Sequence, residues 1–116
     1  MFIQTHAFRQ EAARVGLTLE DLRAIENEIG VDPHRWPVFA GARGLRKMRY
    51  APERRAGGKS GGVRICNFVV ERASHIYLVT MFAKNEKQNL NPADREAIRA
   101  WMSRVKKAYE KGRKDG

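Results

Sequence analysis

The 116-residue sequence predicts a single α+β domain, residues 1–116, in which helices pack on a small antiparallel sheet. Three observations lead to this fold class. Apolar residues recur at helical spacing in the first third of the chain and again near its end. Between these regions, two neighbouring segments are rich in branched and aromatic residues, as strands are. The length fits one domain and is too short for two ordinary ones.

The N-terminal third predicts a short strand followed by two helices. Residues 2–3 are apolar and open the strand, and Thr5 can cap a helix over residues 6–15. A second helix is expected to begin at Thr18, with acidic residues in its first turn, and to end at Gly30. Each helix has one apolar face, so both are expected to lie on the same face of the sheet.

The rest of the chain predicts three strands and a final helix. Residues 45–50 alternate, residues 63–72 are rich in branched side chains, and residues 75–83 form the returning strand of a meander. Asn91 is a suitable cap and Pro92 a suitable first residue for a C-terminal helix. The last five residues are expected to fray.

Positive charge is concentrated in the second part of the sequence. Residues 1–36 have a net charge of −2 and residues 37–116 one of +12, which together give +10. Eight basic residues lie between Arg43 and Arg64, and six lie between Arg104 and Lys114. This asymmetry indicates a polyanionic partner, with nucleic acid first, anionic lipid as the rival, and a merely solvated surface as the third possibility.

Several classes of protein are excluded by composition. No run approaches the roughly 18 apolar residues of a membrane span, and the N-terminus has no signal segment, so a cytoplasmic protein without membrane contacts is expected. Cys66 is the single cysteine, which excludes an internal disulfide and a multi-cysteine metal site, and no cofactor or metal is predicted. The segment Gly58-Lys59-Ser60 lacks the upstream glycine and the following helix of a phosphate-binding P-loop.

Three segments of the predicted meander carry distinctive motifs. They are Gly44-Leu45-Arg46-Lys47-Met48-Arg49-Tyr50, Gly58-Lys59-Ser60-Gly61-Gly62-Val63-Arg64, and the segment from Ile76 to Glu86 that ends in Ala83-Lys84-Asn85-Glu86. In this order and spacing they resemble the RelE/HigB superfamily of bacterial type II toxins, in particular its HigB-like branch. The resemblance runs from about Gly44 to Trp101. It implies a RelE-like fold with two N-terminal helices on one sheet face, a ribosome-dependent mRNA endoribonuclease activity without a cofactor, and a cognate antitoxin, of helix-turn-helix type, as partner beside ribosome and mRNA.

RNA cleavage by a ribose 2′-hydroxyl needs a proton acceptor, cations to stabilise the phosphorane, and a donor to the leaving 5′-oxygen. Toxins of this superfamily place Lys and Arg on a concave sheet face. The catalytic residues that the resemblance implies are Arg64, Lys84, Lys59 and Lys47. The RNA-binding residues predicted with them are Arg46, Arg49, Tyr50, Phe82, Asn85, Lys106 and Lys107. Arg64 is expected to brace the scissile phosphate, because a guanidinium matches two phosphate oxygens.

Other residues leave the acid–base assignment open. Glu86 is either an acid–base partner or, as the more ordinary interpretation, part of a salt bridge to Lys47 or Lys87. The three histidines are not expected to be catalytic. Where some relatives have tyrosines, this chain has Asn67, Phe68 and Phe82. Two alternative functions stay open: a ParE-type toxin that poisons DNA gyrase, and an RNA-binding module without catalysis.

Overall fold

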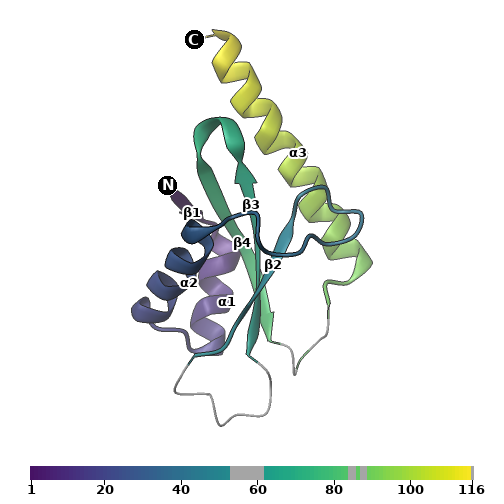
Figure 1. Cartoon of the computed structure of the whole chain (residues 1–116). Helices are drawn as coiled ribbons and strands as arrows, with labels where there is room; N and C mark the ends of the chain where they lie inside the picture. The colour runs from purple at the N-terminus through teal and green to yellow at the C-terminus, as the bar shows by residue number, and fades with distance from the viewer. Residues whose placement is uncertain (53–61, 84–85, 87–88, 116) are drawn as a thin grey trace.

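The computed structural model describes residues 1–52, 62–83, 86 and 89–115. Over these residues it is an α+β fold with three helices and a four-stranded sheet, which confirms the predicted class (Figure 1). The elements are β1 (Phe2–Gln4), α1 (His6–Val15), α2 (Leu19–Val31), β2 (Arg46–Tyr50), β3 (Val63–Val70), a 3₁₀ turn (Glu71–Ala73), β4 (His75–Ala83) and α3 (Pro92–Asp115). Within the described residues, no helix combines the length and the hydropathy needed to cross a bilayer.

The sheet is mixed, with strand order β1-β4-β3-β2. Strands β2, β3 and β4 form the predicted antiparallel meander, whereas β1 joins the outer edge of β4 in parallel. Thr5 fixes this pairing, because its backbone N–H donates to Leu78 and its hydroxyl donates to the carbonyl of Val79 at 2.6 Å. The register of β3 and β4 shifts between Cys66 and Asn67, where β4 has one extra residue.

The helix starts are those that the capping residues predict. The Thr5 hydroxyl accepts a hydrogen bond from Phe8 N at 3.0 Å, and Thr18 and Asp21 form a complete capping box. The predicted end of α2 is wrong, because the helix continues through Gly30 to Val31. Helix α3 extends to Asp115, further than the sequence predicted, and Gly116 lies outside the described residues.

The two sheet faces bury separate hydrophobic clusters. Helices α1 and α2 cover one face, where Phe8, Ile25 and Leu78 are fully buried. Helix α3 crosses the other face, where Phe68 and Met102 are buried. Figure 1 shows that the far end of α3 extends beyond the sheet. The sheet is therefore enclosed on both faces by helices, and only the part of the second face that α3 leaves uncovered can serve a polar function.

An aromatic cluster attaches α3 to the sheet. The ring of Phe68 stacks on that of Tyr77 at 5.0 Å, and Trp101 meets both rings edge-on. The hydroxyls of Tyr77 and Tyr109 are 2.9 Å apart, and His75 Nδ1 is 2.7 Å from the Tyr109 hydroxyl. Burial, and then the hydrogen bond with Tyr109, raise the pKa of Tyr77 to about 12.

This raised pKa gives a testable dependence of stability on pH. An unfolded tyrosine titrates near pH 10, so the folded chain holds this proton more tightly. The stability contributed by neutral Tyr77 is complete below about pH 10 and is lost as the pH rises through about 12. In a titration followed by ultraviolet absorbance, one tyrosine should ionise at a higher pH than the others, and Tyr77→Phe should remove that transition. The variant should also lose less stability between pH 10 and 12 than the parent chain. Equal losses in both proteins would contradict this.

Gly62, directly before β3, has a conformation and surroundings that exclude a side chain. Its φ is +78°, and a Cβ there would lie 2.3 Å from the carbonyl oxygen of Tyr50. We therefore expect Gly62→Ala to lower the free energy of unfolding by about 2–4 kcal/mol. Gly41→Ala is the matched control, since Gly41 has φ +74° but open space around it. Its backbone strain alone should cost about 1 kcal/mol in urea unfolding. Equal costs would show that the Tyr50 carbonyl does not matter.

Candidate functional site

Two arginines lie directly opposite each other on neighbouring strands. Arg49 of β2 pairs with Arg64 of β3, and Arg64 pairs in turn with Phe82 of β4. Directly opposed residues share a sheet face, with Cβ atoms about 4.5–5.5 Å apart in antiparallel strands. Lys47, two residues before Arg49, lies on the same face. We call Lys47, Arg49 and Arg64 the cationic face.

The electrostatics of this face are unfavourable in isolation. Like charges directly opposite each other destabilise a sheet. Burial lowers the pKa of Arg64 from its ordinary value, and the positive charge of Arg49 lowers it further. Arg64 is half-buried, so its charge is less screened than one on the open surface. Two adjacent cations that repel each other are typical of a site that binds an anion.

Lys47 extends the cationic face along β2. Its ammonium lies 5.2 Å from the ring centroid of Phe39, on a half-buried side chain. A cation over an aromatic face is held electrostatically, so this contact limits where the ammonium can go. The face therefore offers two guanidinium forks and one positioned ammonium, a combination suited to phosphate oxygens.

Three of the predicted site residues, Lys59, Lys84 and Asn85, lie outside the described residues. The described residues of the cationic face are therefore Lys47, Arg49 and Arg64, together with the neighbouring Phe82. Of these, Arg64 and Lys47 are predicted as catalytic, and Arg64 is at the centre of the cross-strand row.

Arg46 and Tyr50 do not belong to this face, because strand alternation sends them to the opposite side of β2. The Arg46 guanidinium donates to the carbonyls of His34 at 3.1 Å and Trp36 at 2.6 Å, which ties the connector before β2 to the sheet. The Tyr50 hydroxyl donates to Asp21 Oδ1 at 2.9 Å, against α2. In the structure both residues have structural contacts, and neither lies beside Arg64.

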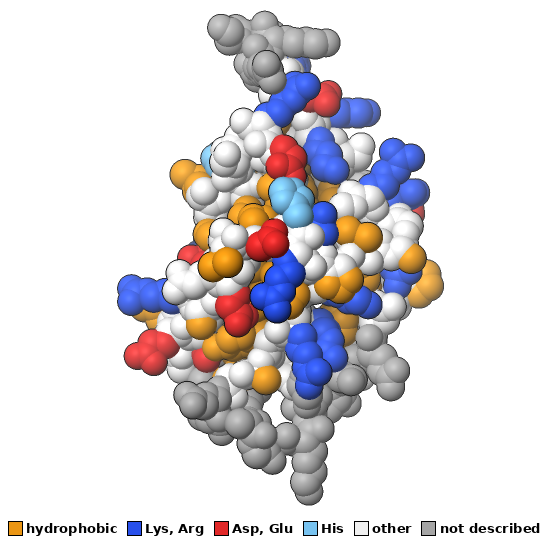
Figure 2. Space-filling model, in the orientation of Figure 1, with side chains coloured by type: hydrophobic (Ala, Val, Ile, Leu, Met, Phe, Trp, Pro, Cys, Tyr) orange, Lys and Arg blue, Asp and Glu red, His pale blue; other side chains and the backbone are white. Residues whose placement is uncertain are grey.

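The other predicted RNA-binding residues are spread over the second face. Phe82 is only 2% exposed, so its ring packs in the core and does not offer a face for stacking on a base. Lys106 of α3 donates to the carbonyl of Arg43 at 3.4 Å, and Lys107 is exposed. Figure 2 shows Lys and Arg side chains over α3 and at the lower end of the molecule. The basic surface is therefore wider than the cationic face.

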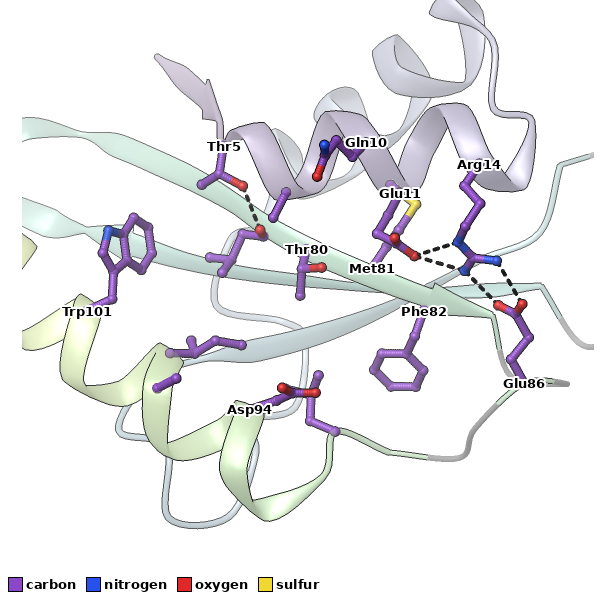
Figure 3. Close-up of a pocket in the computed structure, with 15 residues that line it drawn as sticks. Thr5, Gln10, Glu11, Arg14, Thr80, Met81, Phe82, Glu86, Asp94 and Trp101 are labelled. Carbon is purple, nitrogen blue, oxygen red and sulfur yellow. Dashed lines mark hydrogen bonds and ion pairs between the residues drawn. The ribbon is translucent and has the colours of Figure 1, made fainter.

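Glu86 forms an ion pair with a residue that the sequence did not suggest. Both of its carboxylate oxygens accept hydrogen bonds from Arg14 of α1, each at 2.7 Å (Figure 3). The salt bridge that the sequence predicts for Glu86 is thus present with Arg14 as a partner, whereas Lys87, which was predicted with Lys47 as a possible partner, lies outside the described residues. Because 72 residues separate the two partners, no local pattern could have revealed this pair. It raises the pKa of Arg14.

The histidines lie away from the cationic face. His6 begins α1, His34 pairs with Glu71, and His75 contacts Tyr109 at the start of β4. His75 is seven residues from Phe82 along β4, about 23 Å in an extended strand. Among the described residues, no group of three or more His, Cys, Asp or Glu side chains could hold a metal ion. No model of a known protein family matches this chain.

Proposed function

We propose that this chain is a toxin of the RelE/HigB type that cleaves messenger RNA on the ribosome and thereby inhibits translation. The observation that carries the proposal is the cross-strand pair of Arg49 and Arg64 on one sheet face, in which Arg64 is half-buried and has a lowered pKa. The motifs around this pair, from Gly44 to Tyr50 and from Gly58 to Arg64, support the same function through their resemblance to the superfamily. The net charge of +10 suits a ribosomal partner.

In the proposed reaction, a ribose 2′-oxygen attacks the adjacent phosphorus and the bond from phosphorus to the 5′-oxygen breaks. The products are a 2′,3′-cyclic phosphate and a free 5′-hydroxyl, so no water or cofactor is consumed. Arg64 and Arg49 would bind the non-bridging oxygens and stabilise the charge that develops on the phosphorane. The proton transfers would fall to Lys59 and Lys84, the residues that the resemblance assigns to this role.

The partners and location follow from this proposal. The chain would act in the cytoplasm on ribosome-bound messages and would be neutralised by a cognate antitoxin, of helix-turn-helix type, until needed. Electrostatic steering toward the ribosome would make association fast and dependent on salt.

Cell-free translation with primer extension on the message tests the proposed function. The purified chain should produce new 5′-ends at defined positions when ribosomes translate the message. Naked message should be cut poorly, because the described cationic face supplies charge but no histidine pair for acid–base catalysis. Equal cleavage of naked and ribosome-bound message would contradict the ribosome dependence.

The same experiment separates the two alternative functions. A ParE-type toxin would leave messages intact and inhibit supercoiling by purified DNA gyrase. An RNA-binding module would bind ribosomes without producing new 5′-ends. The position of Arg64 beside Arg49 on one sheet face favours the nuclease over the ParE-type toxin, and the appearance of new 5′-ends is what separates it from an RNA-binding module.

A further inference from the structure

A hollow opens between α3 and the connector that precedes β2. It has a volume of about 410 Å³, and Figure 1 shows this connector running beside α3. The polar residues that line it come from both segments and are Arg43, Glu96, Arg99, Ser103 and Lys106. We call it the α3 hollow. It is distinct from the cationic face, since no residue of that face lines it.

Helix α3 supplies most of this polar lining from one side. Spacings of three, four and three residues keep side chains on one face of a helix, as they do for Glu96, Arg99, Ser103 and Lys106. Lys106 joins this face to the connector, because its ammonium donates to the carbonyl of Arg43 at 3.4 Å. An ammonium has three N–H donors, so this contact leaves two for a ligand.

The backbone at Arg43 has an uncommon conformation. Among the described residues other than glycine, only Arg43 and Ser74 have a positive φ, which is +42° at Arg43. The neighbouring Gly41 and Gly44 also have positive φ, at +74° and +94°. Glycine or asparagine fits such a position with less strain than arginine does. Strain of this kind gathers at binding sites, and here it accompanies a cation at the hollow.

The charge of the α3 hollow is positive. Three cations and one carboxylate line it, which gives a net charge of +2. Glu96 contacts Arg99 through Nη2 alone, at 3.0 Å, so the Nε and Nη1 donors of Arg99 stay outside this ion pair. Within the described part of the chain, no carboxylate pairs with Arg43 or Lys106. Guanidinium, ammonium and hydroxyl donors around a positive hollow suit the oxygens of a phosphate.

We propose that the α3 hollow binds a phosphate of an RNA backbone, as a second anchor beside the cationic face. The Lys106 ammonium lies 6.0 Å from the ring centroid of Phe68, and Phe68 follows Arg64 by four residues on β3, about 13 Å along the strand. One RNA strand of several nucleotides can therefore contact both sites. The choice of RNA rests on the proposed function, whereas the binding of phosphate does not.

Titration with inorganic phosphate, followed by amide chemical shifts in NMR at constant ionic strength, tests the site itself. The amides of residues 42–44 and 99–106 should show shifts that saturate. Arg43→Asn combined with Lys106→Gln should weaken the apparent affinity at least about tenfold, because two charge-assisted contacts are lost. Asparagine is chosen since it tolerates a positive φ.

The matched control removes two charges elsewhere. Arg9 and Arg72 are exposed and do not line the hollow, and Arg9→Gln combined with Arg72→Asn also lowers the net charge from +10 to +8. This control should change the affinity for phosphate less than about twofold, as screened charges away from the site should. Equal weakening by both double variants would show that net charge alone attracts phosphate, and would overturn the proposal.

A gain of affinity provides a test that misfolding cannot imitate. Glu96→Gln removes the carboxylate from the hollow and releases Arg99, so phosphate should bind about two to five times more tightly, the equivalent of an exposed ion pair. Glu28→Gln, at an exposed position on α2, should leave the affinity unchanged. An unchanged or weaker affinity in Glu96→Gln would contradict the assignment.

A 2′-O-methyl oligouridine of about ten nucleotides tests RNA as the source of the phosphate. It lacks the attacking 2′-hydroxyl, so its binding is measured without cleavage, and a failure of the proposed nuclease activity would leave this result intact. The oligonucleotide should displace inorganic phosphate from the hollow, and the Arg43→Asn, Lys106→Gln variant should bind it at least about tenfold more weakly. Equal binding by variant and parent, or stronger competition by oligoglutamate of the same charge, would overturn RNA as the occupant.

Discussion

Replacement of Arg64 by alanine is expected to reduce ribosome-dependent RNA cleavage by about 10²–10³-fold, the usual cost of removing one preorganised donor from a developing charge. Arg64 lies at the centre of the cross-strand row, between Arg49 and Phe82. The substitution therefore removes the central guanidinium of the proposed phosphate site. Primer extension on translated message gives the rate. Arg23→Ala is a matched control, because Arg23 is exposed on α2, a helix that covers the other sheet face.

The same substitution is expected to have little effect on stability, and this separates a functional role from a structural one. Arg64 is half-buried beside another cation, so removing its charge relieves repulsion with Arg49. Arg64→Gln keeps part of the aliphatic stem and a polar end, so its unfolding temperature is expected to stay within a few degrees of that of the parent chain. Loss of activity together with a large loss of stability would indicate that Arg64 maintains the fold. Full activity in both variants would remove Arg64 from the site.

The elements of this fold were largely predictable because their signals are local. Thr5, Thr18 and Asn91 begin helices through hydrogen bonds to residues three positions ahead. The alternation in β2 correctly separates Lys47 and Arg49 from Met48 and Tyr50. The end of α2 was predicted wrongly because a single glycine is tolerated within a helix, and α2 continues through Gly30 to Val31.

The site was less predictable because its contacts join distant parts of the chain. Arg46 and Tyr50 are a basic and an aromatic residue within a motif, which is why the sequence predicted RNA binding for them. In the structure, the Arg46 guanidinium donates to carbonyls of the connector before β2, and the Tyr50 hydroxyl donates to the carboxylate of Asp21. Composition cannot distinguish such a role from RNA binding, because both need a polar group at the end of a long side chain. The Arg14–Glu86 pair likewise depends on how α1 packs against the end of β4.

Reversal of charge on α3 is expected to weaken ribosome binding by about 10²-fold or more, because basic side chains that contact phosphate release counterions. Arg104, Lys107 and Lys111 are all exposed on this helix. Changing all three to Glu lowers the net charge by six, from +10 to +4. The dependence of the logarithm of affinity on that of salt should become shallower by about 0.7–0.9 for each phosphate that the helix no longer touches.

The matched control must change the net charge equally but at a different place. Arg9, Arg23 and Arg35 are exposed in the N-terminal third, and changing them to Glu also gives +4. If α3 itself contacts the ribosome, only the α3 variant should show the shallower salt dependence in filter binding. Its cleavage positions should not change, because contacts to the phosphate backbone position a protein without reading sequence. Equal weakening in both variants would show that net charge alone attracts this chain to the ribosome, and unchanged affinity in the α3 variant would make that helix only a solvated surface.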